Sequence, residues 1–253
     1  MMNNANEISR KTKLYGYIGE NAGVSRFSAI LNKMFKSNGD DAMIIPMNIR
    51  KDDFYFTLSN MKKSHVEGAV ISNEFVCDVP EILDEASSMV KRSGMCDIVF
   101  REGEKLRGDI YGTRVLSEHL KDMGVAKIAM IGTSPHARAF SFLACGFHIS
   151  FFNDNLEELM RFTQDVELKD ADINRLAKGM HVDLSQYDAL LDFSDMQSLD
   201  MIVVLPGLNL DMKNEKEFSA LGARARELGA SYTSYDDILE KLTNRAYKAI
   251  KGK

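Results

Sequence analysis

The fold is decided by residues 127–147, KIAMIGTSPHARAFSFLACGF, which have the pattern of an apolar strand, a tight turn and a helix. Such a turn binds dinucleotide phosphate when it carries the pattern GxGxxG/A. Gly132 fits the first position and Ala137 the third, whereas Ser134 replaces the second glycine. Asp154 follows the next strand, where an acidic residue would bind a ribose hydroxyl, and this favours NAD over NADP.

A second interpretation of the same turn needs no ligand. Ser134 is a good helix N-cap, and Pro135 suits the first helical position. In this interpretation His136 is an ordinary surface histidine at the start of a helix. In the first interpretation it lies close enough to the turn to contact a phosphate. The turn by itself therefore leaves two interpretations open, a dinucleotide loop that includes Thr133 or a plain capped helix.

Composition narrows the class of protein. Hydrophobic residues make up 45% and charged residues 27% of the 253 residues, with a formal net charge of -5. No long run of Lys or Arg appears, which argues against a nucleic-acid partner. MMNNANEISRKTK, at the start, lacks the apolar core of a signal peptide, and no apolar run approaches the ~20 residues that span a bilayer. Cys77, Cys96 and Cys145 form no CxxC pair, so we expect a cytoplasmic protein without membrane association.

Strands and helices alternate along the chain in two series. The first series has strands at 13–19, 42–47, 68–72, 96–100 and 105–110, and helices at 25–39, 51–63 and 79–92. The second has a linking helix at 111–124, strands at 127–132, 148–152, 188–193 and 200–205 with helices between them, and an amphipathic helix at 234–250. Alternation of this kind predicts an α/β fold with parallel sheets.

We therefore expect two α/β domains. Residues 1–110 form an N-terminal substrate-type domain, on which a C-terminal helix at 234–253 packs back. Residues 111–233 form a Rossmann-like, doubly wound dinucleotide-binding domain. The cleft between two such domains is the default site for a small-molecule ligand. No sequence signal fixes an oligomeric state.

The order of these segments resembles the shikimate/quinate dehydrogenase family over nearly the whole chain. YGYIGENAGVSRFSAILNKMF (15–35) is similar to the family's opening strand, serine-containing substrate loop and first helix. IRKDDFYFTLSNMKKSHVEGAVIS (49–72) is similar to the stretch that leads to its catalytic lysine. The further similarities are GMCDIVF (94–100) to its Gly-Ala-Val-Asn-Thr segment, LRGDIYGTRVL (106–116) to its Gly-x-Asn-Thr-Asp strand, KIAMIGTSPHARA (127–139) to its glycine loop, and residues 220–250 to its closing segment.

The resemblance implies site residues, and most of them differ from the family's. The family's lysine falls on Glu74, its partner aspartate on Gly112 with Asp109 nearby, its substrate-binding asparagine on Asp97, and one of its two substrate serines on Ser25. The second serine falls on Phe27, the glutamine of the closing helix on Leu242, the Asn-Arg-Thr cofactor motif on Asn153, Asp154 and Asn155, and the Asn-Ala-Thr segment on Asp192, Phe193 and Ser194. The chain thus resembles a divergent member that lacks most catalytic motif residues.

These positions give the candidate site. The catalytic candidates are Glu74 and Asp109, the substrate-binding candidates are Ser25, Asn73 and Asp97, and the cofactor-binding candidates are Gly132, Thr133, Ser134, His136, Ala137, Asn153 and Asp154. Carboxylates gathered in one site would repel the carboxylate of shikimate and would suit a neutral or cationic ligand. The alternative is that they are solvated loop residues. Phe27 and Leu242 are expected to pack in the core. We expect no metal, because no His lies at ligand spacing near these carboxylates.

Three hypotheses for function follow. In the first, the chain binds NAD or NADP, with NAD favoured by Asp154, together with a small metabolite, and ordinary shikimate oxidoreduction is weak or lost. In the second, it is a non-catalytic descendant that binds a metabolite or a partner protein. In the third, it is a Rossmann protein that uses another nucleotide-containing cofactor, such as S-adenosylmethionine.

Overall fold

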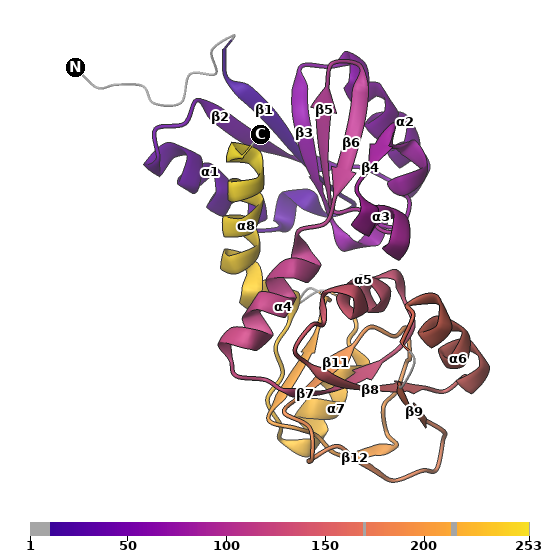
Figure 1. Ribbon diagram of the computed structural model, residues 1–253. Coiled ribbons are helices and arrows are strands. Elements are labelled where there is room, and N and C mark those ends of the chain that lie inside the picture. Colours follow the sequence, from indigo (N-terminus) through magenta and orange to yellow (C-terminus); the bar gives the residue numbers. More distant parts are fainter. Residues whose placement is uncertain (1–10, 169–170, 214–216, 253) are drawn as a thin grey trace. The chain divides into compact units, whose positions relative to one another are not determined.

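The computed structural model describes residues 11–168, 171–213 and 217–252, and the chain divides into two compact units. The first comprises Met1–Tyr111 with Glu240–Lys253, and the second comprises Gly112–Leu239. Each unit has its own main sheet with helices packed on it, which confirms the predicted α/β class (Figure 1). Within the described ranges, no helix has both the length and the apolar character needed to cross a membrane.

The first unit is built on a six-stranded sheet with the strand order β2-β1-β3-β5-β6-β4. All its neighbouring strands pair in parallel except β5, which is antiparallel to both of its neighbours. The strands are β1 (Lys13–Gly19), β2 (Ala42–Asn48), β3 (Val66–Ile71), β4 (Glu85–Ala86), β5 (Ile98–Glu102) and β6 (Lys105–Asp109). Consequently β1, β2, β3 and β6 all end at one edge of the sheet, and β5 begins there.

Aromatic packing holds the helices of the first unit on this sheet. The α-helices are α1 (Phe27–Ser37), α2 (Lys51–Asn60), α3 (Ser88–Ser93) and α8 (Leu239–Lys251). Phe35 of α1 lies between Tyr15 of β1 and Tyr247 of α8, with ring centroids 6.2 and 5.7 Å away. The Tyr247 hydroxyl also donates to Asp40 at 2.7 Å, and Lys251 forms an ion pair with the same carboxylate. The C-terminal helix is therefore fixed to the turn that follows α1.

The helix predicted at 79–92 is wrong. The chain instead forms a 3-10 turn at Pro80–Ile82, the short strand β4 and then α3. The Asp84 carboxylate accepts from the Leu106 backbone N–H at 2.7 Å, and the Ser87 N–H donates to the Gly108 carbonyl at 3.1 Å. Pairing with β6 thus takes the backbone groups that a continuous helix would have used, and the helix starts only after Ser87.

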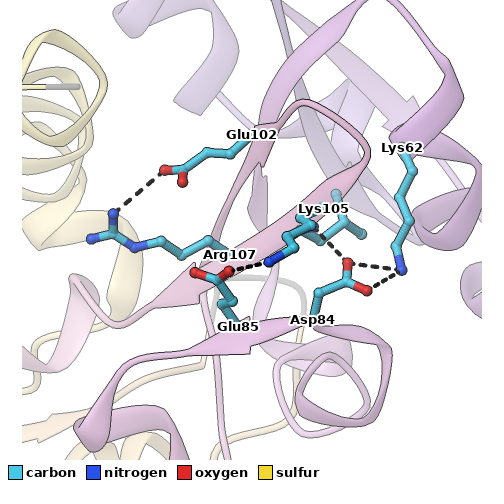
Figure 2. Close-up of polar contacts among 7 residues, drawn as sticks. Lys62, Asp84, Glu85, Glu102, Lys105 and Arg107 are labelled. Carbon is cyan, nitrogen blue, oxygen red and sulfur yellow. Dashed lines mark hydrogen bonds and ion pairs between the residues drawn. The ribbon is translucent and has the colours of Figure 1, made fainter.

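Ion pairs lie along the side of the first sheet where β4 is the outermost strand (Figure 2). Lys62 pairs with Asp84 and Lys105 with Glu85, both at 2.8 Å, and Arg107 lies 3.4 Å from Glu102. The Lys62 ammonium, followed by the Leu106 N–H, lowers the pKa of Asp84. Exposed pairs of this kind contribute at most about 1 kcal/mol each. They leave the short strand β4 edged with charge, which discourages pairing with another chain.

The second unit has a five-stranded, all-parallel sheet with the order β13-β11-β7-β8-β9. Its strands are β7 (Lys127–Ile131), β8 (His148–Asn153), β9 (Asp172–Arg175), β11 (Ala189–Asp192) and β13 (Leu208–Asp211). In chain order this is the 3-2-1-4-5 arrangement of a Rossmann-like domain. The order reverses between β7 and β11, so the topological switch point lies where these two strands end.

Helices cover both faces of this sheet (Figure 1). On one face, Phe162 of α6 (Leu156–Asp165) contacts Phe151 of β8, and α5 (Pro135–Leu143) packs against α4 (Gly112–Asp122). On the other, Leu221 of α7 (Ala220–Leu228) belongs to a buried cluster with Ile131 and Phe152. Because alternate residues of a strand face opposite sides, Phe151 and Phe152 give each face its own core.

The strands near the far side of the second unit differ from the prediction. The segment predicted as a strand at 200–205 forms β12 (Ile202–Val204), which pairs with β10 (Val182–Asp183) in a separate two-stranded sheet. No helix joins β11 to β12 in the described chain, contrary to expectation. The main sheet is completed by β9 and β13, which were not predicted. Both are short and rich in polar residues, so they lack the apolar pattern of a buried strand.

Candidate functional site

The predicted substrate-side residues lie at the carboxyl edge of the first sheet. Ser25 follows β1, Asn73 and Glu74 follow β3, Asp97 directly precedes β5, and Asp109 ends β6. The Ile71 N–H donates to the Asp97 carbonyl at 2.9 Å, and the Asp97 N–H donates to the Asp109 carbonyl at 3.3 Å. The backbones of these acidic positions are therefore neighbours on adjacent strands. Gly112, at the family's aspartate position, is instead the first residue of α4.

Glu74, on which the resemblance places the family's lysine, is a hydrogen-bond acceptor that joins two strand ends. Its Oε1 accepts from the Glu20 backbone N–H at 2.8 Å, and its Oε2 accepts from the Ser72 hydroxyl at 2.5 Å. The carboxylate lies close over Gly19, where an added Cβ would come within 2.9 Å of Oε1. A lysine ammonium accepts no hydrogen bond, so a lysine at this exposed position would leave both donors to solvent. The carboxylate thus supplies two hydrogen bonds that a lysine could not.

Asp97 and Asp109 also hold backbone groups in place. Asp97 is buried, and its Oδ1 accepts from the Tyr111 N–H at 2.7 Å. Asp109 is half-buried, and its Oδ1 accepts from the Ser87 hydroxyl and the Ile110 N–H, each at 2.8 Å. Both carboxylates therefore help to shape the connection out of the first sheet, whatever else they bind.

Burial and the charge of Asp97 raise the pKa of the neighbouring Cys96 thiol. Cys96 is fully buried, and its Sγ donates to the Ile98 carbonyl at 3.3 Å. A thiol kept protonated and out of contact with solvent is a poor nucleophile. Cys96 is therefore a core residue of this edge rather than a reactive one.

The apolar replacements at the family's substrate positions pack in the core, as expected. Phe27 has no exposed surface and stacks on Tyr17, with 4.8 Å between ring centroids. Leu242 of α8 is likewise fully buried. Ser25 is half-buried, and its hydroxyl accepts from the Phe27 N–H at 3.2 Å. Asn73, also half-buried, begins the 3-10 turn Asn73–Phe75.

The glycine turn of the second unit lies at the topological switch point. Gly132 follows β7 with a φ of +94°, a conformation that disfavours any side chain. A Cβ at this position would lie 2.8 Å from the backbone of Phe193 and Ser194, which follow β11. Ligands of open parallel sheets bind at this crevice. The close approach of the two loops therefore explains why glycine is required.

The structure shows the capped helix at Ser134, and the dinucleotide interpretation of the same segment stays a prediction. Ser134 caps α5, its hydroxyl accepting from the Ala137 N–H at 3.4 Å, and Pro135 occupies the first turn. Ala137 is fully buried, as the third position of a dinucleotide turn requires. The capped helix still points its N-terminal dipole at the glycine turn, where it favours an anion.

His136 supplies no positive charge to this turn at pH 7. The imidazole is half-buried and stacks on Phe193, with ring centroids 6.4 Å apart. Desolvation by the surrounding side chains lowers the pKa of His136 to about 4. The histidine is therefore neutral and acts as an aromatic contact between the two loops.

The loop that follows β8 is acidic. Asn153 is buried and accepts from the Asp154 N–H at 2.9 Å, while the Asp154 side chain is exposed. Asn155 caps α6 by accepting from the Glu158 N–H at 3.2 Å. The Glu158 carboxylate in turn accepts a hydrogen bond from the Thr133 hydroxyl on the glycine turn. Sequence reasoning missed Glu158, although its place in the first turn of the helix after Asp154 was a usable signal.

Asp192, which ends β11 at the switch point, is a carboxyl group with a raised pKa. It is buried, and its Oδ1 accepts from both the N–H and the hydroxyl of Ser194, at 2.9 and 2.6 Å. Its buried Oδ2 has no partner within the described part of the chain. Burial raises the pKa of Asp192 to about 6, with the neighbouring Asp211 adding to the rise and Lys213 opposing it.

No metal centre accompanies these groups in the structure. Among residues 11–168, 171–213 and 217–252, no group of three or more His, Cys, Asp or Glu side chains gathers closely enough to hold a metal ion. The carboxylates described above instead accept hydrogen bonds from the protein's own N–H and O–H groups.

The fold and the turn define the class of protein. A parallel sheet with the Rossmann-like order, a glycine turn at its switch point and a helix that begins after that turn give the second unit the architecture of a Rossmann-like domain. A separate α/β unit precedes it in the chain.

Comparison with known proteins finds curated relatives that are similar to part of the chain. The chain is 25% identical over 158 residues to the shikimate dehydrogenase (NADP(+)) of Pyrococcus furiosus, covering 61% of this chain and 58% of that protein. It is 28% identical over 145 residues to that of Dictyoglomus turgidum, covering 55% and 53%. The matched region therefore spans less than two thirds of these curated relatives. No family model matches the chain.

Solved structures extend the likeness to nearly the whole fold. The shikimate dehydrogenase of Aquifex aeolicus superposes with a TM-score of 0.75 at 17% identity, covering 98% of this chain and 95% of that one. The shikimate 5-dehydrogenase of Listeria monocytogenes in complex with shikimate and NAD gives 0.71 at 18%, covering 98% and 94%. The 5-ketofructose reductase of a Gluconobacter strain gives 0.73 at 16%, covering 97% and 95%. The chain is therefore similar to shikimate dehydrogenases over part of its sequence and shares their fold over nearly its whole length.

Proposed function

We propose that this chain binds a nicotinamide dinucleotide on its second unit and a small metabolite at the carboxyl edge of its first sheet, with ordinary shikimate oxidoreduction weak or lost. The observation that carries the proposal is Glu74. The family resemblance implies a catalytic lysine at this position, and here a carboxylate accepts hydrogen bonds from Glu20 and Ser72.

The chemistry of alcohol oxidation explains why this exchange matters. Hydride transfer from a carbinol needs a group that takes the hydroxyl proton and a positive charge that steadies the developing alkoxide. Glu74 can accept a proton, but it offers no cation, and Asp109 and Asp97 add further negative charge at the same edge. A shikimate carboxylate would be repelled there. A neutral or cationic polyol suits this edge better.

Three features of the second unit support the binding of a dinucleotide. When bound, the nicotinamide group supplies hydride-transfer chemistry. Gly132 forms the tight turn of the motif's first position, and Thr133 and Ser134 lie at the N-terminus of α5, whose dipole favours a phosphate. Asp154, exposed after β8, would accept hydrogen bonds from the adenosine ribose, which favours NAD over NADP.

The second candidate is a non-catalytic descendant that binds a metabolite or a partner. It is favoured by one observation, namely that Glu74, Asp97 and Asp109 all accept hydrogen bonds from the protein's own backbone. Such engagement stabilises the edge without requiring a reaction. A different nucleotide cofactor, such as S-adenosylmethionine, is the third candidate, since Asp154 would serve its ribose equally well. We place all three candidates in the cytoplasm, in keeping with the free Cys77, Cys96 and Cys145.

Mass spectrometry of ligand that co-purifies with the protein separates these candidates. We expect a nicotinamide dinucleotide, whereas S-adenosylmethionine would overturn the assignment of the cofactor. In parallel, NADP reduction with shikimate should proceed at background rate. Robust turnover would show that Glu74 does not stand in the place of the family's lysine. Turnover of a different polyol or hydroxy acid with NAD would exclude the non-catalytic candidate.

A further inference from the structure

The strand β2 is the outermost strand on one side of the first sheet, which we call the β2 side. Its sequence, AMIIPMN, contains no charged residue, and the Ile45 side chain is 40% exposed. An outermost strand presents unpaired N–H and C=O groups, on which a strand of another chain can add. On the opposite side of the sheet, β4 is short and carries charge (Figure 2). The apolar β2 lacks that protection.

The pairing of β2 with β1 identifies the backbone groups of β2 that face outward. The two strands pair in parallel, and the Lys13 N–H donates to the Asp41 carbonyl at 2.9 Å. Beyond the other end of the strand, the Ile49 N–H donates to the Gly19 carbonyl at 3.0 Å. Successive residues of a strand alternate between its two sides, so odd-numbered residues direct their backbone groups to β1. The residues of β2 that face outward are Ala42, Ile44, Pro46 and Asn48.

A side chain from α1 occupies the outward groups of Ile44. The Ile44 N–H donates to Asn32 Oδ1, and Asn32 Nδ2 donates to the Ile44 carbonyl, each at 2.8 Å. Two residues of an antiparallel ladder exchange the same pair of hydrogen bonds. The Asn32 amide therefore takes the place that a residue of an added strand would need. Asn32 is half-buried, and its helix packs beside β2 (Figure 1).

Pro46 closes the next outward position in a different way. Proline has no backbone N–H and cannot donate to a further strand. Because the N–H of Ile44 is already bonded to Asn32, neither of these two positions offers a donor to another chain. Both effects act through the backbone, so the Ile44 side chain stays apolar and is buried in the core.

We propose that Asn32, together with Pro46, closes the β2 side of the first sheet to strand addition by a second copy of this chain. The strand that is excluded is β2 of the other copy, because two identical outermost strands can pair about a two-fold axis. Asparagine is a poor residue for the interior of a helix, and its bonds to β2 explain its presence in α1. The inference concerns the first unit alone, so it stands or falls independently of the proposed function.

Amide hydrogen exchange tests the contact in the wild-type chain. Ala42 and Ile44 both face outward, but only the Ile44 amide donates to Asn32. We expect the Ile44 amide to exchange at least about tenfold more slowly than the Ala42 amide. In the variant N32A the Ile44 amide should lose this protection. The wild-type comparison needs no variant, so it remains decisive if N32A fails to fold.

Sedimentation velocity over a range of protein concentrations tests the consequence for assembly. The sedimentation coefficient of N32A should rise with concentration more steeply than that of the wild type. The Ile44 amide of N32A should become protected again as the variant associates, because β2 then pairs with its copy. N32A combined with P46V, which adds an outward N–H, should associate more strongly than N32A.

Two control variants separate an open strand from a general loss of stability. N32D keeps an acceptor for the Ile44 N–H and adds charge to the β2 side, so it should not associate. It still loses the donor to the Ile44 carbonyl, as N32A does. N38A removes the asparagine that follows the same helix, whose Nδ2 donates to the Met34 carbonyl, and should match the wild type. Urea unfolding establishes that each variant is folded.

Each outcome decides the inference. Association of N32A that neither N32D nor N38A shares would support it. Equally fast exchange of the Ile44 and Ala42 amides in the wild type would overturn it, and so would equal association of N32A and N32D. A folded N32A that associates no more than the wild type would also overturn it.

Discussion

Replacing Asp192 with asparagine should make the protein more stable than the wild type at neutral pH. At acidic pH the same variant should be less stable than the wild type. The carboxyl group is buried with one oxygen unpartnered in the described residues, so its ionised form is costly. Because its folded pKa is raised to about 6 from 3.8, the folded state holds this proton more tightly than the unfolded state does. Stability is therefore highest below the ordinary pKa and is lost as the pH rises through about 6.

The size of the effect follows from this pKa difference. At 1.36 kcal/mol per pH unit, the ionisation of Asp192 costs about 3 kcal/mol of folding free energy above pH 6. D192N carries no charge at any pH and keeps the oxygen that accepts from Ser194. Its new amide lacks an acceptor, which costs about 1 kcal/mol. We expect D192N to be about 2 kcal/mol more stable than the wild type at pH 7.5 and about 1 kcal/mol less stable at pH 4.

Urea unfolding followed by far-ultraviolet circular dichroism, repeated from pH 4 to pH 7.5, measures this directly. The chain has no tryptophan, so fluorescence is a weaker probe. Asp195 lies three residues on in the same loop and is exposed, and D195N should change stability by less than about 0.5 kcal/mol throughout. Stability curves for D192N and the wild type that run parallel across this pH range would show that ionisation of Asp192 does not destabilise the fold.

The remaining predictions concern three other contacts. G132A should lower stability by about 2 kcal/mol or more in urea unfolding, because the left-handed φ and the Phe193 backbone both exclude a Cβ; an unchanged midpoint would contradict this. D40N should lower stability at pH 7, because the Lys251 and Tyr247 contacts hold the pKa of Asp40 below its usual range. The loss of stability relative to the wild type should vanish as the pH falls through the lowered pKa of Asp40. A loss that stays constant with pH would argue against the ion pair. Because the pKa of His136 is lowered to about 4 in the folded state, wild-type stability should rise by up to about 3 kcal/mol between pH 4 and 6.5. H136Q should lack this rise. A variant that keeps the rise would show that another group causes it.

The elements with a strong apolar period were predictable. α1 and α8 present Phe27, Leu31 and Leu242 to the core as their spacing indicates. The helix predicted at 79–92 was wrong because the apolar residues of this segment also fit a helical spacing. The pairing of β4 with β6, which the sequence does not show, prevents a continuous helix here. β13 was missed since it buries Asn209, whose amide donates to the Pro206 and Ser231 carbonyls, far from any local sequence signal.

The site was predictable in its positions and not in its contacts. Strand order brings Glu74, Asp97 and Asp109 to one sheet edge, which follows from parallel topology. Glu74 accepts a hydrogen bond from the N–H of Glu20, which lies 54 positions earlier in the chain, and this contact depends on tertiary structure. The same holds for Glu158, which reaches Thr133 only because α5 and α6 begin beside each other. The sequence resemblance predicts Glu74 at the place of a lysine, whereas the hydrogen bonds of this carboxylate are visible only in the fold.

Calorimetric titration of NAD+ and NADP+ into the purified wild-type chain tests the proposed dinucleotide binding most directly. We expect saturable binding of NAD+ and binding of NADP+ that is at least about tenfold weaker. Absence of binding of either dinucleotide at millimolar concentration, with the protein shown to be folded, would contradict the proposed dinucleotide binding.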